Sequence, residues 1–199
     1  MVIKMEKSSY HHHNLRQELI QAGIQIIDEE GYDKLSLRKA AVMCGVSHAA
    51  PKNHFADKEE FCEAIKKHVT DEFAAYLERA IEHSSDDNIM IRDLGRAYIQ
   101  FFEDNPQCYH LIMEQKDVNI HISEHEIEDS EYMPFQIFQV NASRVLRKMG
   151  VPEEGIPQKI IELWAMVNGL VSLRLIKGFH YEGDWMTMVN RIIHAEDEH

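Results

Sequence analysis

The chain is poor in cysteine and has no long hydrophobic run. Its three cysteines, Cys44, Cys62 and Cys108, are an odd number and lie far apart in 199 residues, which argues against a disulfide framework and favours a reducing compartment. No run of about 18 apolar residues occurs and no signal-like segment opens the chain. We therefore expect a cytoplasmic protein with no membrane partner.

Basic residues are also scarce, since 21 Lys and Arg stand against 34 Asp and Glu, for a net charge of −13. The imbalance is local: residues 1–55 hold 7 basic and 6 acidic side chains with five histidines, whereas residues 56–199 hold 14 basic and 28 acidic ones. Phosphates repel the acidic part. Any contact with DNA is thus confined to the N-terminal part and must rely on a few placed cations, helix N-termini and dimerisation.

Internal repeats, low-complexity tracts and credible strand pairs are absent, and almost every long segment has the periodicity of a helix. The expected fold class is all-α with about nine helices. We expect three domains or segments, at 1–56, 57–83 (a connector helix capped by Asp57) and 84–199. The predicted helices cover 15–30, 36–44, 47–54, 57–83, 91–104, 105–115, 135–149, 156–179 and 184–195, with an acidic loop at 117–131.

The most informative segment is Leu35 to Phe61, which reads as two short helices joined at Gly45-Val46 and followed by an acidic cap. Ser36 can cap the first helix, and Gly45 can adopt the left-handed backbone that ends it. Ser47 is expected to cap a second helix, Ser47 to His54, in which Pro51 is tolerated near the first turn. This pattern is typical of a DNA-reading helix-turn-helix, although an ordinary helical hairpin with a glycine turn has the same spacing.

The stretch from Tyr10 to about Ala64 resembles the N-terminal domain of TetR-type transcriptional regulators. One subgroup of the family is especially similar at Gly45-Val46-Ser47-His48-Ala49-Ala50-Pro51 and at His54-Phe55-Ala56-Asp57-Lys58-Glu59. Members of this subgroup tend to begin with Tyr-His-His-x-x-Leu-Arg, and this string is matched here by Tyr10, His11, His12, Leu15 and Arg16. A purification-tag remnant is the alternative source of His11 to His13. That subgroup also carries Trp-x-x-x-His-Gly, matched by Trp164, Asn168 and Gly169 with the histidine replaced.

The resemblance implies a homodimer that binds double-stranded DNA at a palindromic operator. Lys52 stands where the family usually has a tyrosine that meets a phosphate, and lysine can contact phosphate as a point charge. The residues implied at the DNA are Ser36, Arg38, Ser47, His48, Ala49, Lys52, Asn53, His54 and Lys58. A helical interaction module that binds no DNA is an alternative.

A small-molecule effector is the second implied partner. Aromatic and methionine side chains converge from several predicted helices, which suits a mainly apolar ligand positioned by one or two polar groups, although each of them is also an ordinary core residue. The candidate ligand-binding residues are Tyr98, Phe101, Phe102, Tyr109, Met113, Phe138, Trp164 and Asn168.

The segment from Ile160 to Leu175 is apolar around most of its helical surface. One side must pack in its own domain and another is expected to meet a partner. In the family this helix and the last one form a four-helix dimer interface, whereas a helix buried within a monomer is the alternative.

His121, Glu124 and His125 match His-x-x-Glu-His, the inverted zinc-protease pattern. A metalloenzyme or a metal-binding protein is therefore the rival hypothesis, and a solvated loop is the third interpretation. The segment lacks the apolar stripe that would hold a catalytic helix. We expect the protein to be a repressor that an effector releases from its operator. We expect it to have no enzymatic activity, cofactor or metal.

Overall fold

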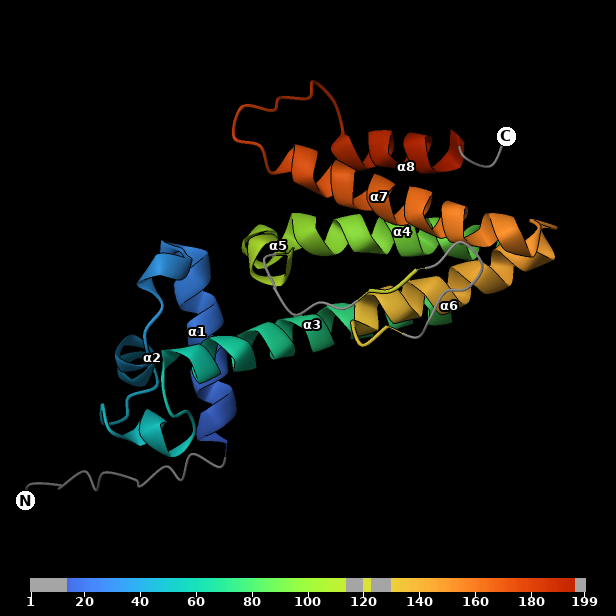
Figure 1. Cartoon of the computed structure of the whole chain (residues 1–199). Helices are drawn as coiled ribbons and strands as arrows, with labels where there is room; N and C mark the ends of the chain where they lie inside the picture. The colour runs from blue at the N-terminus through green and yellow to red at the C-terminus, as the bar shows by residue number, and fades with distance from the viewer. Residues whose placement is uncertain (1–13, 114–119, 123–129, 196–199) are drawn as a thin grey trace, which may run out of the picture. The chain divides into compact units, whose positions relative to one another are not determined.

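The computed structural model describes residues 14–113, 120–122 and 130–195, and every long element within them is a helix (Figure 1). Eight α-helices and three short 3₁₀ helices, η1 to η3, follow one another. The all-α fold class is confirmed, and the number of α-helices is close to the nine expected. None of the helices in these described ranges is long and apolar enough to cross a membrane.

The chain divides into two compact units, residues 1–65 and 66–199, and the division falls inside the long helix α3, Lys58–His83. Unit 1 also holds α1 (Leu15–Glu30), η1 (Tyr32–Lys34), α2 (Leu37–Met43) and η2 (Ala50–Asn53). Its core is formed by fully buried side chains at helical spacing, namely Leu19, Ile20, Ile26, Leu35, Ala40, Ala41, Phe55, Phe61 and Ile65.

In unit 1, α1 and α3 approach each other closely at Gly23. A Cβ built on Gly23 would lie 2.4 Å from Cδ1 of Ile65 and 2.8 Å from Cζ of Phe61. Both distances are shorter than van der Waals contact, and both neighbours are fully buried. A side chain here would force Ile65 and Phe61 to shift within the core, so packing and not backbone conformation favours glycine.

In unit 2, α4 (Asp87–Asp104) is the central helix. It contacts α5 (Pro106–Met113), α6 (Met133–Lys148), α7 (Ile156–Arg174) and α8 (Trp185–Ala195). The short η3, Glu153–Gly155, precedes α7. Most predicted boundaries lie within a few residues of these bounds, and α4 begins at Asp87, earlier than the expected start at residue 91.

One predicted helix end is wrong. The periodicity predicts a helix over 156–179, but α7 ends at Arg174. From there the amide of Ile176 donates to the carbonyl of Leu173 and that of Phe179 to Ile176, over 3.2 and 2.9 Å. In both hydrogen bonds the acceptor lies three residues before the donor, which is the pattern of turns. The apolar sequence pattern therefore continues beyond the end of the α-helix.

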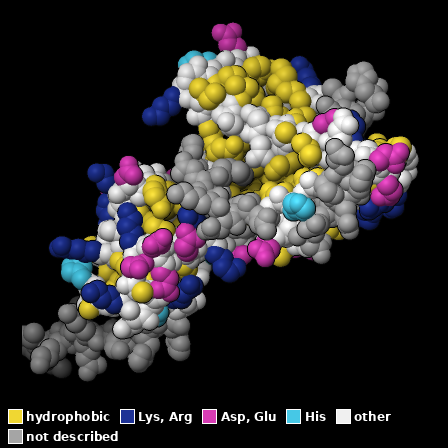
Figure 2. Space-filling view, in the orientation of Figure 1, with side chains coloured by type: hydrophobic (Ala, Val, Ile, Leu, Met, Phe, Trp, Pro, Cys, Tyr) yellow, Lys and Arg dark blue, Asp and Glu magenta, His cyan; other side chains and the backbone are white. Residues whose placement is uncertain are grey.

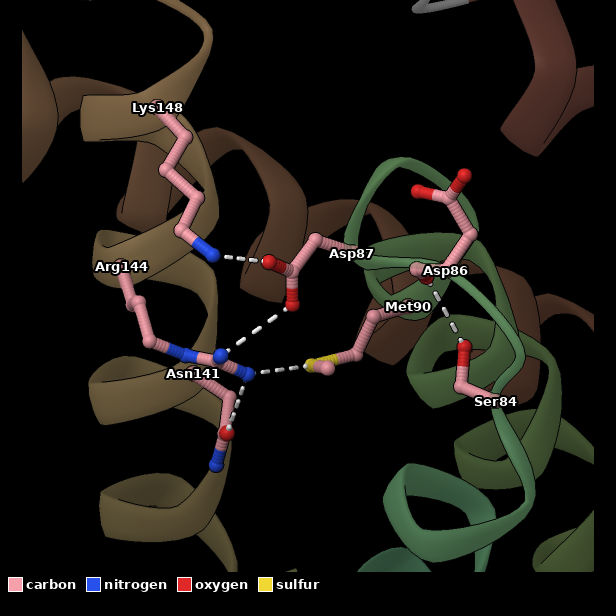
Figure 3. A network of polar contacts seen from close by, with 7 residues as sticks. All are labelled: Ser84, Asp86, Asp87, Met90, Asn141, Arg144 and Lys148. Carbon is pink, nitrogen blue, oxygen red and sulfur yellow. Dashed lines mark hydrogen bonds and ion pairs between the residues drawn. The ribbon is translucent and has the colours of Figure 1, made fainter.

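A polar clamp joins α4 to α6 (Figure 3). Asp87, in the first turn of α4, accepts from Nζ of Lys148 and forms an ion pair of 3.1 Å with Arg144. Arg144 also reaches the sulfur of Met90 at 3.2 Å. The hydrogen bond from Lys148, together with the charge of Arg144, holds the pKa of the Asp87 carboxyl below its ordinary value.

Candidate DNA-binding site

The first helix of the helix-turn-helix segment has the predicted caps. The hydroxyl of Ser36 accepts from the amide of Lys39 at 3.2 Å, which satisfies one orphan donor at the start of α2. At the other end Gly45 has φ +68°, and the amides of Gly45 and Val46 donate to the carbonyls of Val42 and Ala41 over 3.1 and 3.0 Å. This pair of bonds is a Schellman motif, so the sequence correctly located the turn.

The second helix differs from the prediction of an α-helix from Ser47 to His54. Regular helix is confined to η2, Ala50–Asn53, which has no side-chain cap. The amides of Lys52 and His54 donate to carbonyls three residues back, at 3.2 and 2.9 Å. Pro51 is buried in the first turn of this segment, which winds as a short 3₁₀ helix. Because η2 has no side-chain cap, the expected cap by Ser47 is wrong.

Most of the expected DNA-contacting side chains of unit 1 are exposed. Ser36 is half-buried and its hydroxyl already serves as a cap, while His54 is half-buried next to Phe55, with ring centroids 6.5 Å apart. The exposed members are Arg38, Ser47, His48, Ala49, Lys52, Asn53 and Lys58. Between Ser47 and Asn53 all residues are therefore exposed except the half-buried Ala50 and the buried Pro51.

Several cations of unit 1 have partners that the sequence did not reveal. Lys39 forms an ion pair with Glu30, nine residues earlier, and the guanidinium of Arg16 lies 5.2 Å from the ring centroid of Phe55. The ammonium group of Lys58 lies 5.8 Å from the ring centroid of Tyr32. Tyr32 was not among the predicted site residues, and its place directly after Gly31 is the signal that could have drawn attention to it.

The N-terminus of α3 is capped by acidic side chains, as predicted for Asp57. Oδ1 of Asp57 accepts from the amide of Glu60 at 2.9 Å, and the carboxylate of Glu60 accepts from the amide of Ala56 at 2.6 Å. These carboxylates occupy the donors that would otherwise attract a phosphate. Phosphate contacts near this end would have to come from the Lys58 side chain.

In unit 2 the predicted effector-binding residues form one aromatic cluster. The ring of Tyr98 lies 5.1 Å from that of Trp164 and 5.3 Å from that of Phe102, and Phe138 lies 5.3 Å from Trp164. Tyr109 stacks edge-on against Phe102 at 5.3 Å. Phe101 contacts Phe102 directly at 5.2 Å. Phe73 of α3, a residue absent from the predicted set, lies 4.7 Å from Phe101 and also belongs to the cluster.

Polar atoms of this cluster converge around Tyr98, which is only 2% exposed. Its hydroxyl donates to Oδ1 of Asn168 at 2.9 Å, and burial raises the pKa of Tyr98 well above its ordinary value. Tyr132 is close enough to Tyr98 to contribute to that increase. The buried hydroxyl of Tyr132 itself has no hydrogen-bond partner in the described part of the chain.

Two predicted features fall partly outside the described residues. Met113 is the last residue of α5, but its side chain lies outside them. Glu124 and His125 of the His-x-x-Glu-His pattern also lie outside them, as do His11 to His13 and most of the acidic segment 117–131. Over the ranges that are described, no group of three or more His, Cys, Asp or Glu side chains could hold a metal ion.

Apolar side chains are exposed on α7 and just after it. Ile161, Leu173 and Ile176 are all exposed, with Leu173 at 39%. Figure 2 shows hydrophobic side chains gathered over the region of α7 and α8. The same helix buries Ile160, Val167 and Val171 in unit 2, so its apolar character does extend over two sides.

Comparison with known proteins agrees with this architecture. Residues 91–195 match the tetracyclin repressor-like, C-terminal domain. The nucleoid occlusion factor SlmA of Photobacterium profundum is 25% identical over 180 residues, which cover 85% of this chain and 88% of SlmA.

Two solved structures show the same fold. A protein of unknown function from Rhodococcus sp. RHA1 superposes with a TM-score of 0.69 at 22% identity, covering 96% of each chain. The regulator FadR of Bacillus subtilis, in complex with stearoyl-CoA, has a TM-score of 0.64 at 15% identity, covering 89% of this chain and 95% of FadR. With more than half of its length matched to the family's C-terminal domain, the chain belongs to the TetR family of transcriptional regulators.

Proposed function

We propose that this chain is a ligand-responsive repressor that binds a palindromic operator as a homodimer and leaves it when a mainly apolar effector binds. The observation that carries the proposal is the helix-turn-helix of unit 1, in which the Schellman turn at Gly45 leads into an exposed segment. That segment carries His48, Lys52 and Asn53 on its surface.

Operator reading rests on those exposed side chains. Asn53 can pair with base edges in the major groove, whereas Lys52 supplies charge to a phosphate. Arg38 of α2 and Lys58 of α3 flank the segment in the chain, and both are exposed. Because few cations in residues 14–65 lack an intramolecular partner, each phosphate contact there accounts for a large share of the affinity.

Dimerisation through α7 and α8 is supported by the exposed Ile161 and Leu173. A twofold dimer presents two copies of the reading segment to the two half-sites of a palindrome. A monomer would make only half of the contacts with the operator and would lose the gain in affinity that comes from linking the two reading segments.

The effector site is proposed at the aromatic cluster. Its walls are apolar, and Tyr132 offers a buried hydroxyl that has no partner in the described residues, while Tyr98 is already bonded to Asn168. Such a site suits an apolar molecule with one uncharged polar group. FadR, which has the same fold, is described in complex with stearoyl-CoA. The acyl chain is the part of such a ligand that the apolar walls would accept, so long-chain acyl compounds are the first candidates to test.

Selection of binding sequences from random duplex DNA tests the operator proposal. We expect an enriched palindrome, and binding followed by fluorescence anisotropy should weaken with salt. In Lys52→Ala the slope of log affinity against log salt should fall by about 1 for each phosphate that the lysine no longer neutralises, with little change in sequence preference.

The matched control is Lys34→Ala, which removes an exposed lysine of unit 1 outside the proposed site. It should keep the wild-type slope. Failure to enrich any sequence, or a Lys52→Ala variant that changes base preference at one position with the slope intact, would contradict these assignments.

Stearoyl-CoA tests the effector proposal, with coenzyme A alone as its control. We expect stearoyl-CoA to lower the affinity of the protein for its operator. Saturating operator should lower the affinity for stearoyl-CoA by the same factor, typically about 5- to 150-fold. Tyr132→Phe should weaken effector binding and leave operator binding unchanged. Equal effector affinities with and without operator would mean that the ligand does not regulate DNA binding.

A further inference from the structure

A hollow lies in unit 2, between the end of α3 and the middle of α4. Its volume is about 480 Å³, within the range of roughly 300 to 1,000 Å³ that is common for small-molecule sites. The lining residues repeat at helical spacing on both helices, so two facing stripes form the walls of this groove. They are Tyr76, Arg79, Ala80 and His83 on α3, and Asp93, Arg96, Ala97 and Gln100 on α4.

The polar rim of this groove contains two guanidinium groups and a single carboxylate. Neither Arg79 nor Arg96 has an ion-pair partner anywhere in the part of the chain that is described, and the same holds for Asp93. In a C-terminal part with twice as many acidic as basic residues, two unpaired arginines in one hollow form a local positive site. Such a site attracts anions.

Two contacts hold the polar groups of α3 in place. The Arg79 guanidinium lies 5.5 Å from the ring centroid of Tyr76, another residue that lines the groove. Nδ1 of His83 lies 2.6 Å from the carbonyl oxygen of Arg79. Because a carbonyl can only accept, Nδ1 carries the proton, and Nε2 remains as the second polar atom of the ring.

Between the rims the groove offers a small apolar surface, formed by Ala80 and by the buried Ala97. A single carboxylate would be satisfied by one arginine, whereas a phosphoryl group has enough oxygens for two. The arrangement therefore suits a ligand in which a phosphoryl group is attached to a compact apolar body.

We propose that this groove binds a small organic phosphate, with its phosphoryl oxygens held by Arg79 and Arg96 and its apolar body against Ala80 and Ala97. The groove shares no lining residue with the predicted effector-binding set, although its Tyr76 contacts Phe101 of the aromatic cluster at 5.7 Å. The proposal does not depend on the proposed operator binding. Asp93 at the rim can accept from a hydroxyl or amino group of the ligand.

Isothermal titration of the full-length protein with phenyl phosphate tests the site. We expect saturable binding, weaker binding of benzoate, which carries the same ring with a single carboxylate, and none of phenol. Arg79→Gln and Arg96→Gln should each reduce the affinity for phenyl phosphate by about 10- to 100-fold, as expected for the loss of a charge-assisted hydrogen bond.

Lys67→Gln is the matched control, because it removes the same charge from α3 at an exposed lysine that pairs with Asp71, outside the groove. It should change the affinity by less than about twofold. The proposal is overturned if wild-type protein shows no saturable binding up to about 10 mM phenyl phosphate. It is also overturned if phenol binds equally well, or if Lys67→Gln weakens binding as much as Arg96→Gln while circular dichroism shows all variants folded.

Discussion

The hydroxyl of Tyr98 on α4 donates a hydrogen bond of 2.9 Å to Oδ1 of Asn168 on α7, and Asn168 in turn donates to the carbonyl of Trp164 at 2.8 Å. The side-chain amide is thereby fixed in orientation, with its nitrogen toward its own helix and its oxygen toward α4. A histidine at this position, as in the similar subgroup, would titrate near neutral pH. Asparagine keeps the hydrogen bond and removes that titration.

Removing the donor tests this relationship. Tyr98→Phe leaves Oδ1 of Asn168 without its partner in a half-buried place, which should lower the free energy of unfolding by about 1 kcal/mol. Urea unfolding followed by circular dichroism measures the change. Tyr181→Phe is the control, because Tyr181 is exposed, and it should change stability by less than about 0.5 kcal/mol. Equal losses of stability in the two variants would show that the bond contributes nothing.

Local signals in the sequence located the parts of the fold that depend on neighbouring residues. The cap by Ser36, the turn at Gly45 and the acidic cap at Asp57 each involve residues within a few positions, so their chemistry can be read directly. The ion pair of Asp87 with Lys148 joins residues 61 positions apart, and no local pattern reveals it. The 3₁₀ winding at Pro51 escaped prediction because helix spacing and turn spacing are too similar over four residues.

The same contrast holds for the candidate sites. The exposed segment from Ser47 to Asn53 follows from a motif, whereas the groove lined by Arg79 and Arg96 depends on how α3 packs on α4. Helical periodicity identified Phe101 and Trp164 as apolar but did not indicate which hydroxyl would lack a partner. Tyr132 emerged only from the packing of its surroundings.

The packing at Gly23 predicts a large effect from a small substitution. In Gly23→Ala the new methyl group would overlap Ile65 and Phe61, and overpacking of this kind costs about 1 to 3 kcal/mol. Gly178→Ala is the control, since no atom lies within 4 Å of a Cβ there. Thermal unfolding should show a clearly lower midpoint for Gly23→Ala alone. An unchanged midpoint would mean that α1 and α3 separate without cost.

The clamp at Asp87 predicts a dependence of stability on acid. Because the folded state lowers the pKa of Asp87, its contribution is fully present above the unfolded pKa of about 3.9 and is lost as the pH falls through the folded value. The melting temperature of Asp87→Asn should therefore lie below that of the wild type at pH 6, and the difference should shrink toward pH 3. Glu154→Gln, at an exposed carboxylate, should show no such trend. A difference that stays constant with pH would exclude the clamp as its source.

The exposed apolar face of α7 predicts how the protein assembles. A charge at Leu173 must be desolvated if this face lies in a dimer interface, whereas it costs little if the face meets water. Leu173→Asp should therefore lower the oligomer mass measured by light scattering and abolish operator binding while helical content is retained. Val140→Asp is the matched control, because Val140 is an equally apolar residue that is exposed to 53% but lies on α6 and not on α7 or α8, and it should keep the wild-type mass. A wild-type protein that is monomeric at micromolar concentration would overturn the proposed dimer, and operator reading would then rest on a single copy of the segment around Lys52.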